Sequence, residues 1–536
     1  MARPTTALLG RHGCDHGQPY HATKAQLISA LTNRYIQPIE KTDYRLHVLA
    51  PCFRRKLFRR RNPILREPSC TVQYTRKYFL RLYRVAVTKR CTLATAKRED
   101  SLTQSAMITG GATDGAATSE DAPPLRHSRG LTLALLGAVY AVHFCDRQIL
   151  AILIPPIKAD LGLSDTALGF LSGFAFTVFF STVGLVIARI ADHADRARII
   201  TWSLAVFSAM TAMCGLATGF WQLLVARIGV GVGEGGTNPA SHSLIADLFA
   251  MRQRSGAMAT YSIGQHIGLV LAFGLGGWLG QTVGWRWTFI IVGAIGLVLA
   301  LLVRAGLRDP RIIIRRNRET LSPSSSEVVH SLLRSRVMRH LFAGATLAQA
   351  AALGLVTWLP ALLTRVHGLS LTQAGVFLAL AFGVAGAACT YLFGHVADTV
   401  GIADARRKPR IVAGCQLLLA ALWLAALFVE DRGIALTMII IPCALVGVYV
   451  GPTIALVQDI VDPRARAFSA AILLLVANLV GASLGPLAVG MLSDALAAST
   501  GPQSLRYALL SMPALLVWSG FHYARAAAGL ASELRK

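Results

Sequence analysis

Residues 134–156 read ALLGAVYAVHFCDRQILAILIPP, an apolar run long enough to cross a lipid bilayer, since a spanning helix needs roughly 20 mostly apolar residues. The run nevertheless carries Asp146 and Arg147 side by side, with His143 one turn earlier. A charged side chain at that depth costs at least ~2.5 kcal/mol to insert, so it normally faces a cavity or a partner. The stretch therefore predicts a membrane helix with functional polar side chains.

The composition of the whole chain is typical of a protein that crosses the membrane many times. Of the 536 residues, 54% are hydrophobic and 15% are charged, whereas soluble domains carry about 25% charged residues. Apolar runs separated by short polar loops recur from residue 131 onward. We predict an all-α integral membrane protein with twelve transmembrane helices, at residues 131–153, 167–190, 199–218, 221–246, 256–283, 287–306, 340–364, 373–397, 410–429, 434–457, 467–490 and 504–523.

Enzymatic chemistry is not indicated anywhere in the sequence. It contains no recognisable nucleophile–base pair or phosphate-binding loop, and no cysteine falls in a CxxC or Cys/His metal spacing. We therefore expect no enzyme activity, no cofactor, no metal site and no nucleic-acid partner. The expected partners are a small-molecule substrate, protons and membrane lipid.

Most of the positive charge precedes the first apolar run. Residues 1–106 hold 21 Lys and Arg against 6 Asp and Glu, a surplus of 15 within the net charge of +26. We predict residues 1–126 to be an unstructured basic N-terminal extension. It is consistent with a disordered arm near anionic lipid or nucleic acid, with an organellar transit segment, or with a start upstream of the mature protein. We favour the last, because no methionine lies between Met1 and Met107 and because the composition turns acidic after Met107.

The rest of the chain divides into two halves that repeat each other. The pattern GLSxTxxG begins at Gly162 and recurs 206 residues later at Gly368. Charged residues at the helix ends repeat in the same order: Asp192 as Asp398, Asp247 as Asp459, and Arg254 as Arg466. We predict a six-helix bundle at 127–307, a linker at 308–339 with an amphipathic segment near its end, a second bundle at 340–525 and a tail at 526–536. Two parallel six-helix repeats are typical of secondary transporters that rock about a central site.

The loop charges predict the orientation. Loops on the side of the N-terminus carry 20 Lys and Arg, and loops on the opposite side carry 5. Positive loops stay on the cytoplasmic side. Both termini and the linker are therefore expected in the cytoplasm, and the membrane is expected to be the inner membrane of a bacterium.

The repeated charges are expected at the cytoplasmic mouth. An acid there can meet a helix N-terminus and pair with nearby arginines, which would lock one orientation of the two halves. The alternative is a solvated loop whose arginines only set the orientation. The predicted gate residues are Asp192, Arg196, Asp247, Arg254, Asp398, Arg406, Asp459 and Arg466.

The charges inside the membrane belong to the first half alone. Asp146 maps onto Ala352 in the repeat, and the stretch that matches Glu234 is apolar. Arg227 and Glu234 are seven residues apart and so share a helix face. Burial disfavours a charged carboxylate and a nearby arginine favours it, so a motion that changes their separation would bind and release a proton. We predict Asp146 and Glu234 to be the proton-coupling residues; a static ion pair between Glu234 and Arg227 is the alternative.

Other polar residues are predicted to line a substrate cavity. Asp146 and Arg147 point about 100° apart on a helix, so we expect one to face the cavity and the other a helix seam. For His143, a hydrogen bond to a neighbouring helix competes with a role in the cavity. The glycines near Glu234 predict close helix packing. The predicted cavity residues are Arg147, Arg227, His143, Asn238 and Gln265, and Gln349 and Asn478 are further polar candidates.

The chain resembles the major facilitator superfamily over residues 131–523. The segment ARIADHADR at 188–196 is similar to the signature loop between helices 2 and 3 of that family, although Ala188 and His193 depart from the pattern. Within it, the chain is similar to the Spinster-like transporters in the Asp146-Arg147 pair, in 227–234, in LIADLF at 244–249 and in NLVGASLGPLAVGMLSD at 478–494.

This resemblance implies the fold of the superfamily and its mechanism. It implies that the acid in helix 1 binds protons, that Arg147, Arg227 and Glu234 line the central cavity, and that lysolipids or sphingoid-type lipids are moved. The segment GEGGTNP at 233–239 is also similar to the anion:cation symporters of organic acids. We therefore expect a proton-coupled secondary transporter of a lipid-like or amphipathic solute that works by alternating access, with a symporter of small organic anions as the alternative. An uncoupled facilitator and a membrane receptor rank lower.

Overall fold

The computed structural model describes residues 129–191, 194–309, 325–392, 407–462 and 465–533, all within one compact unit, Pro123–Lys536. These residues form helices joined by short loops, and no strand occurs within the described ranges. The predicted N-terminal extension, most of the linker, and the predicted gate residues Asp192, Asp398 and Arg406 lie outside them.

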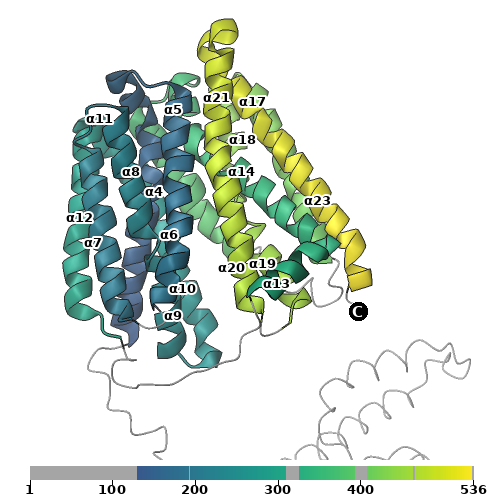
Figure 1. Ribbon diagram of the computed structural model, residues 1–536. Coiled ribbons are helices and arrows are strands. Elements are labelled where there is room, and N and C mark those ends of the chain that lie inside the picture. The colour runs from purple at the N-terminus through teal and green to yellow at the C-terminus, as the bar shows by residue number, and fades with distance from the viewer. Residues whose placement is uncertain (1–128, 192–193, 310–324, 393–406, 463–464, 534–536) are drawn as a thin grey trace, which may run out of the picture. The chain divides into compact units, whose positions relative to one another are not determined.

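The first half consists of six helical segments (Figure 1). They are α4 Arg129–Leu161; α5 Asp165–Gly169 with η2 Phe170–Phe174 and α6 Ala175–Ala191; α7 Arg196–Cys214; α8 Phe220–Glu234 with α9 Thr237–Leu248; α10 Met251–Val270 with η3 Leu271–Leu275 and α11 Gly276–Thr282; and α12 Gly284–Gly306.

The second half follows the short helix α13 Ser325–Arg334, whose apolar face buries Val328 and Leu332 as the predicted amphipathic segment requires. Its segments are α14 Arg336–Arg365; α15 Leu371–Leu378 with η5 Ala379–Ala385; α17 Arg407–Phe428; α18 Arg432–Ala444 with α19 Val450–Ile460; α20 Arg466–Val476 with η6 Ala477–Ala482 and α21 Ser483–Thr500; and, after the turn η7 Gly501–Gln503, α22 Ser504–Leu509 with α23 Ser511–Glu533.

The predicted twelve-helix plan in two pseudo-repeats is confirmed. Among the described residues, nine helices are long and apolar enough to span a membrane, and the last of them, Phe468–Leu530, contains both the eleventh and the twelfth predicted spans. The fourth and tenth spans are each broken in two, at the α8–α9 and α18–α19 junctions. The π-helical turns η2, η3, η5 and η6 fall in the second, fifth, eighth and eleventh segments, so irregular backbone repeats with the sequence. The exact bundle boundaries stay a prediction.

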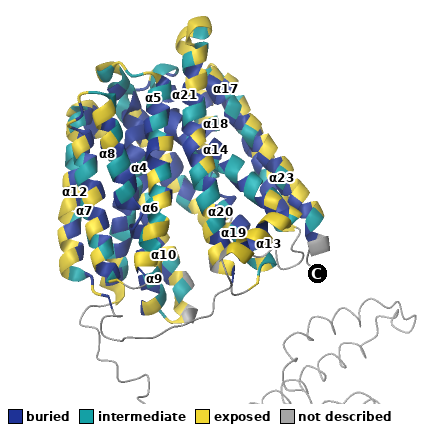
Figure 2. Ribbon diagram, viewed as in Figure 1, coloured by how far each residue is buried: buried dark blue, intermediate teal, exposed yellow. Residues whose placement is uncertain are grey.

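The outer surface of the helices is apolar, as contact with lipid requires. Trp202, Trp221 and Leu301 each expose at least 70% of their surface. Figure 2 shows such exposed positions on the outward faces of the helices, while buried residues face inward.

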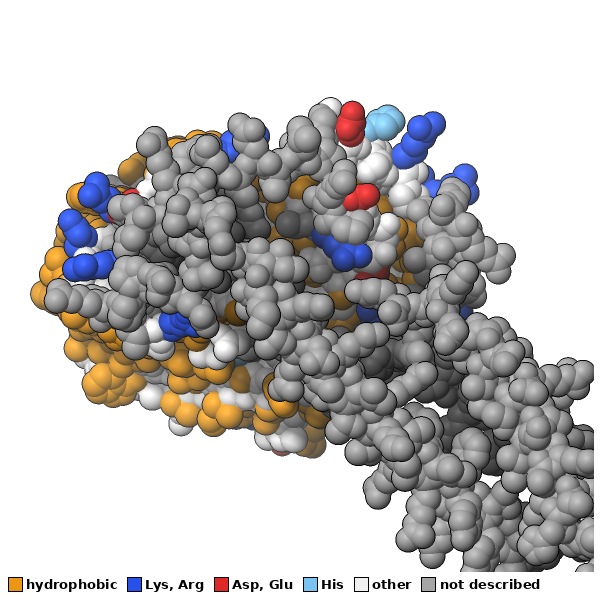
Figure 3. All heavy atoms as spheres, turned by 90° about the horizontal axis from the view of Figure 1, so that it is seen from below, with side chains coloured by type: hydrophobic (Ala, Val, Ile, Leu, Met, Phe, Trp, Pro, Cys, Tyr) orange, Lys and Arg blue, Asp and Glu red, His pale blue; other side chains and the backbone are white. Residues whose placement is uncertain are grey.

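Among the described residues, the apolar core clusters join the two halves at one end of the bundle and not at the other. One core cluster combines Ile149 and Leu153 of α4 with Trp358 and Leu362 of α14, near the end of the bundle that bears α5. Toward the opposite end, which bears α9 and α13, the core is divided into a cluster within each half. Figure 3 views that opposite end, where several separate Lys and Arg side chains are visible between the residues drawn in grey. The halves are thus packed together at the end with α5 (the α5 end) and separately packed at the end with α9 (the α9 end).

Candidate functional site

Asp146 is fully buried in the seam between α4 and α7. Its Oδ2 accepts a hydrogen bond from the Thr211 hydroxyl (3.0 Å), and its Oδ1 has no hydrogen-bond partner among the described residues. The Arg227 guanidinium donates to the backbone carbonyl of Asp146 (3.4 Å) and not to the carboxylate. A neutral hydroxyl therefore holds this acid in place.

Arg147 points away from that seam, toward α6 and the second half. Its side chain is only half-buried, and its guanidinium carbon lies 5.3 Å from the ring centre of Phe176 and 5.8 Å from that of Phe180. It is also within electrostatic reach of Tyr449 in the second half. Of these two neighbouring charged residues, Asp146 therefore lies in the helix seam, and Arg147 lies against the rings of Phe176 and Phe180.

Glu234, the last residue of α8, is fully buried and meets His143 of α4. Its Oε2 lies 3.3 Å from His143 Nδ1, although neither carboxylate oxygen has a hydrogen-bond partner among the described residues. Thr237 supports the pair, because its hydroxyl lies 3.5 Å from the same nitrogen and donates to the Glu234 backbone carbonyl (2.8 Å). Within the described part of the chain, Glu234 forms no ion pair with Arg227, so the alternative of a static pair between them is not found.

An aromatic stack joins the α4 residues to α10. The Tyr140 ring lies 5.8 Å from that of His143 and 4.4 Å from that of Tyr261. The Tyr261 hydroxyl donates to the side-chain carbonyl of Asn238 (3.0 Å). The predicted site residues His143, Asp146, Arg147, Arg227, Glu234 and Asn238 are thereby brought together, whereas Gln265 is half-buried on α10 without a hydrogen bond to this cluster.

The second half contributes hydrogen-bonding groups without charge. Tyr449 donates its hydroxyl to Gln349, whose amide nitrogen donates to Asn478 (3.4 Å). These residues come from α14, from the α18–α19 turn and from η6. The repeat is therefore asymmetric, with carboxylates and arginines on one side and an uncharged polar network on the other.

Two glycines of α8 let its neighbours approach closely, as the sequence predicts. A Cβ atom at Gly231 would lie 2.5 Å from the carbonyl oxygen of Phe176, and one at Gly233 would lie 2.6 Å from the backbone nitrogen of Phe207. The first contact holds α6 against α8 and the second holds α7. These contacts fix the helices that carry the charged side chains.

At the α9 end, Arg196 is completely buried and is held within the first half. Its guanidinium donates to Asp247 (2.8 Å) and to Asp309 (2.8 Å from Nε), and its backbone nitrogen also donates to Asp309 (2.9 Å). Sequence reasoning missed Asp309. Arg254 does not join this cluster; its Nε donates to the backbone carbonyl of Phe249 (3.0 Å).

The second half repeats this contact in a more exposed form. Lys408 pairs with Asp459 (2.9 Å), and both lie 212 residues after Arg196 and Asp247. Lys408 was not predicted, although this offset could have identified it. The predicted gate residue Arg466 is exposed at the start of α20.

A family model of the Major Facilitator Superfamily matches residues 136–486. The chain belongs to the major facilitator superfamily. It is therefore an integral, multi-pass membrane protein and a secondary transporter of small molecules, like the proteins it is similar to, which are transporters and not enzymes.

Three members of the superfamily show the range of similarity. An MFS-type efflux pump of Mycolicibacterium smegmatis is 34% identical over 391 residues, which is 72% of this chain and 89% of that protein. A probable L-galactonate transporter of Escherichia coli is 27% identical over 54% of this chain and 67% of its own length. The crystal structure of a bacterial homologue of the human lysosomal transporter Spinster, inward-facing and unoccupied, is 27% identical, with a TM-score of 0.67 over 76% of this chain and 98% of that one.

Proposed function

We propose that this chain is a proton-coupled transporter of a lipid-like or amphipathic organic solute, working by alternating access between its two halves. The observation that carries the proposal is that Asp146 and Glu234 are fully buried and yet form no ion pair with arginine: Asp146 accepts from Thr211, and the polar group nearest to Glu234 is His143.

Proton exchange is favoured by this arrangement. A carboxylate that is tightly paired with an arginine stays charged, whereas a buried carboxylate that meets only a hydroxyl or an imidazole can become neutral at modest cost. Arg147 and Arg227 are within electrostatic reach of Glu234 without contacting it. A movement that brings either arginine closer would therefore drive a proton off, and the reverse movement would bind one.

The surroundings of Arg147 support an amphipathic solute with a negative group. The Arg147 side chain is partly buried and is bordered by Phe176 and Phe180, with Phe144 close to Tyr140 (5.0 Å between ring centres). Arginine pairs with carboxylates and phosphates through two parallel hydrogen bonds, and aromatic rings accommodate an apolar chain. The similarity to a Spinster homologue agrees with a lipid-like solute.

A symporter of small organic anions is the second candidate. Arg227 is buried with its Nε and one terminal nitrogen unpaired among the described residues, so it has donors to offer a carboxylate. The similarity to a probable L-galactonate transporter agrees with this reading. The two candidates differ in whether the solute needs an apolar part.

We place the α9 end and both termini in the cytoplasm, in a bacterial inner membrane, because the Lys and Arg residues of the loops concentrate at that end. The gate role of the charged residues there is also part of the proposal. Arg196 with Asp247, and Lys408 with Asp459, would stiffen each half so that it moves as one body.

Reconstitution into liposomes tests the proposal. An imposed pH gradient should drive uptake of a radiolabelled lysolipid, and addition of the lysolipid without a gradient should shift the internal pH. Galactonate and an aromatic acid serve as the competing solutes. Transport of galactonate alone would favour the second candidate, and transport that is insensitive to the gradient for all three would overturn proton coupling.

A further inference from the structure

At the α5 end, the first helix turn within the repeated GLSxTxxG pattern is capped by the opposite half. Ser164 caps α5 locally, accepting from the backbone nitrogen of Ala167 (3.1 Å). The two preceding amides instead donate to Asp494 of α21, from Asp165 (3.0 Å) and from Thr166 (2.7 Å). Free amides at a helix start need acceptors and favour a carboxylate. An acid of the second half thus caps a helix of the first.

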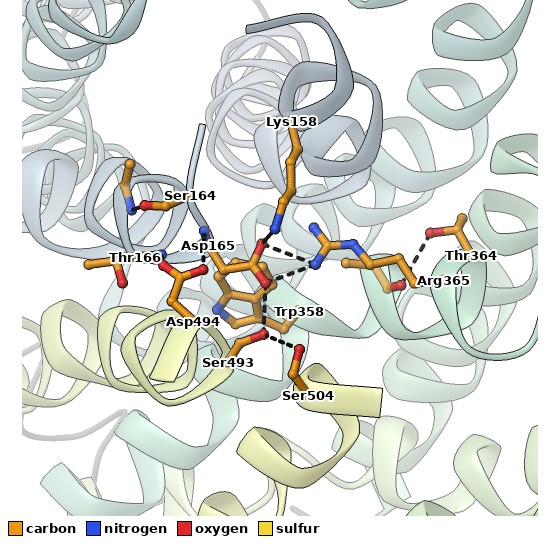
Figure 4. A network of polar contacts seen from close by, with 12 residues as sticks. Lys158, Ser164, Asp165, Thr166, Trp358, Thr364, Arg365, Ser493, Asp494 and Ser504 are labelled. Carbon is orange, nitrogen blue, oxygen red and sulfur yellow. Dashed lines mark hydrogen bonds and ion pairs between the residues drawn. The ribbon is translucent and has the colours of Figure 1, made fainter. Parts of the chain in front are cut away.

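The side chain of Asp165 reinforces this contact. It is almost fully buried and lies between Lys158 (2.6 Å) on its own side and Arg365 (2.9 Å) of α14. Ser493 of α21 also donates to it (2.7 Å). Figure 4 shows Lys158 and Arg365 reaching Asp165 from two sides while Ser493 and Asp494 approach from α21. Three of these four side chains belong to the second half.

The second copy of the GLSxTxxG pattern, which begins at Gly368, makes the corresponding contact with an uncharged acceptor of the first half. Thr372, at the start of α15, donates its backbone N–H to the side-chain oxygen of Gln281 on α11 (2.9 Å). Thr372 lies 206 residues after Thr166, and Asp494 lies 213 residues after Gln281. The first half therefore caps a helix of the second, and the second caps a helix of the first.

A glycine of the opposite half allows each of the two capped helices to pack closely against it. A Cβ atom at Gly490 would collide with the Asp165 carbonyl oxygen, and one at Gly277 would lie 2.8 Å from the Leu371 carbonyl oxygen. Gly490 also lies 213 residues after Gly277, and Leu371 lies 206 after Asp165. The same close backbone contact therefore occurs once in each direction between the halves, and a side chain larger than glycine would hold the helices apart.

We propose that these two exchanged caps form the latch that closes the α5 end, with the Asp494–α5 contact and the Asp165–Arg365 pair as its charged side and the Gln281–α15 contact as its neutral side. When that mouth opens, both caps must separate together, because each joins one half to the other. The proposal rests on alternating access in the proposed function, but on neither the solute nor the proton.

Hydrogen–deuterium exchange of the full chain in nanodiscs tests the latch without substrate or gradient, so its failure would leave the proposed coupling untouched. The key variant is Asp494→Ala, which removes the cap on α5. Its effect on amide exchange is measured at the other cap, on α15, which is not mutated. Amides of 371–378 should exchange roughly tenfold faster, the effect expected from losing a charge-assisted hydrogen bond elsewhere in a shared latch. Gln281→Ala should speed exchange at 165–169 by a smaller factor.

Asp431→Ala is the matched control, because Asp431 caps α18 within its own half (2.8 Å to the Ile434 nitrogen). It should leave both 165–169 and 371–378 unchanged. Arg365→Gln, which keeps both caps, provides a second test should Asp494→Ala fail to fold, and should also speed exchange at 371–378. Faster exchange confined to the mutated contact in these variants would overturn the latch, since the caps would then be independent.

Discussion

Oε2 of Glu234 lies 3.3 Å from Nδ1 of His143, across the contact between α8 and α4. Both side chains are at most 1% exposed, so neither is solvated by bulk water. Arg227, two turns earlier on the same helix as Glu234, reaches the backbone of Asp146 instead. The imidazole and not the guanidinium is therefore the nearest polar group to this carboxylate, although the two form no hydrogen bond.

Replacing His143 tests that contact. Neither carboxylate oxygen of Glu234 has a hydrogen-bond partner among the described residues, so His143→Leu removes the nearest polar group from a buried carboxylate and further disfavours its charged form. We expect lower thermal stability and a shifted pH dependence of transport. His143→Gln, which keeps a hydrogen-bonding group, should restore stability but not the pH dependence. Equal pH profiles in the wild type and in both variants would show that the imidazole takes no part in proton exchange.

Replacing Asp146 tests proton coupling itself. Asp146→Asn keeps the shape of the side chain and an oxygen for the Thr211 hydroxyl, but it cannot release a proton. We expect gradient-driven uptake to be abolished while expression and thermal stability stay near wild type. Glu327→Gln, at an exposed carboxylate on α13, is the control and should transport normally. Undiminished gradient-driven uptake by Asp146→Asn would refute the assignment.

The fold could be predicted from the sequence because each span is a local apolar run and because the repeat fixes the pairing of the halves. The site residues on α4 and α8 were found for a related reason, since a charge in an apolar run is costly and therefore conspicuous. The partner of Asp146 was not found, and neither was one of the partners of Arg196. Thr211 is a neutral residue in an apolar span, and Asp309 pairs with Arg196 from 113 residues away, beyond any local pattern.

The buried ion pairs of Arg196 and the more exposed Lys408–Asp459 pair should contribute differently to the stability of the protein. Asp309→Ala removes one of the two acidic partners of the fully buried Arg196, and breaking a buried pair costs about 3–5 kcal/mol. Asp459→Ala breaks the pair with Lys408, whose partner carboxylate is half-exposed, and such pairs are worth about 0–1 kcal/mol. Thermal unfolding in detergent should therefore drop clearly for the first variant and little for the second. Equal losses would mean that the burial of Arg196 does not matter.

The closely packed glycines of α8, Gly231 and Gly233, should not tolerate larger side chains. Gly233→Leu places a Cβ atom 2.6 Å from the Phe207 backbone nitrogen, which cannot move without shifting α7. Overpacking of this kind typically costs about 1–3 kcal/mol. We expect poor recovery of folded protein and lost transport. Gly256→Ala, at a helical position with open space around it, is the control and should behave as the wild type.

Arg147 and Tyr449 should decide which solute is bound, because Arg147 offers a guanidinium beside the rings of Phe176 and Phe180 and Tyr449 of the second half lies within its electrostatic reach. Arg147→Gln removes the charge and the paired donors, so the KM for an anionic solute should rise by about tenfold or more, while a zwitterionic or neutral analogue with the same apolar chain should be affected less. Tyr449→Phe keeps the ring and removes only the hydroxyl that donates to Gln349, so a smaller rise is expected. Uptake kinetics of a lysolipid series with different head groups measure both effects. A uniform loss across all head groups in Arg147→Gln would show that the guanidinium supports the Phe176 and Phe180 surface and does not recognise the negative group, because a recognition role must depend on the charge of the solute.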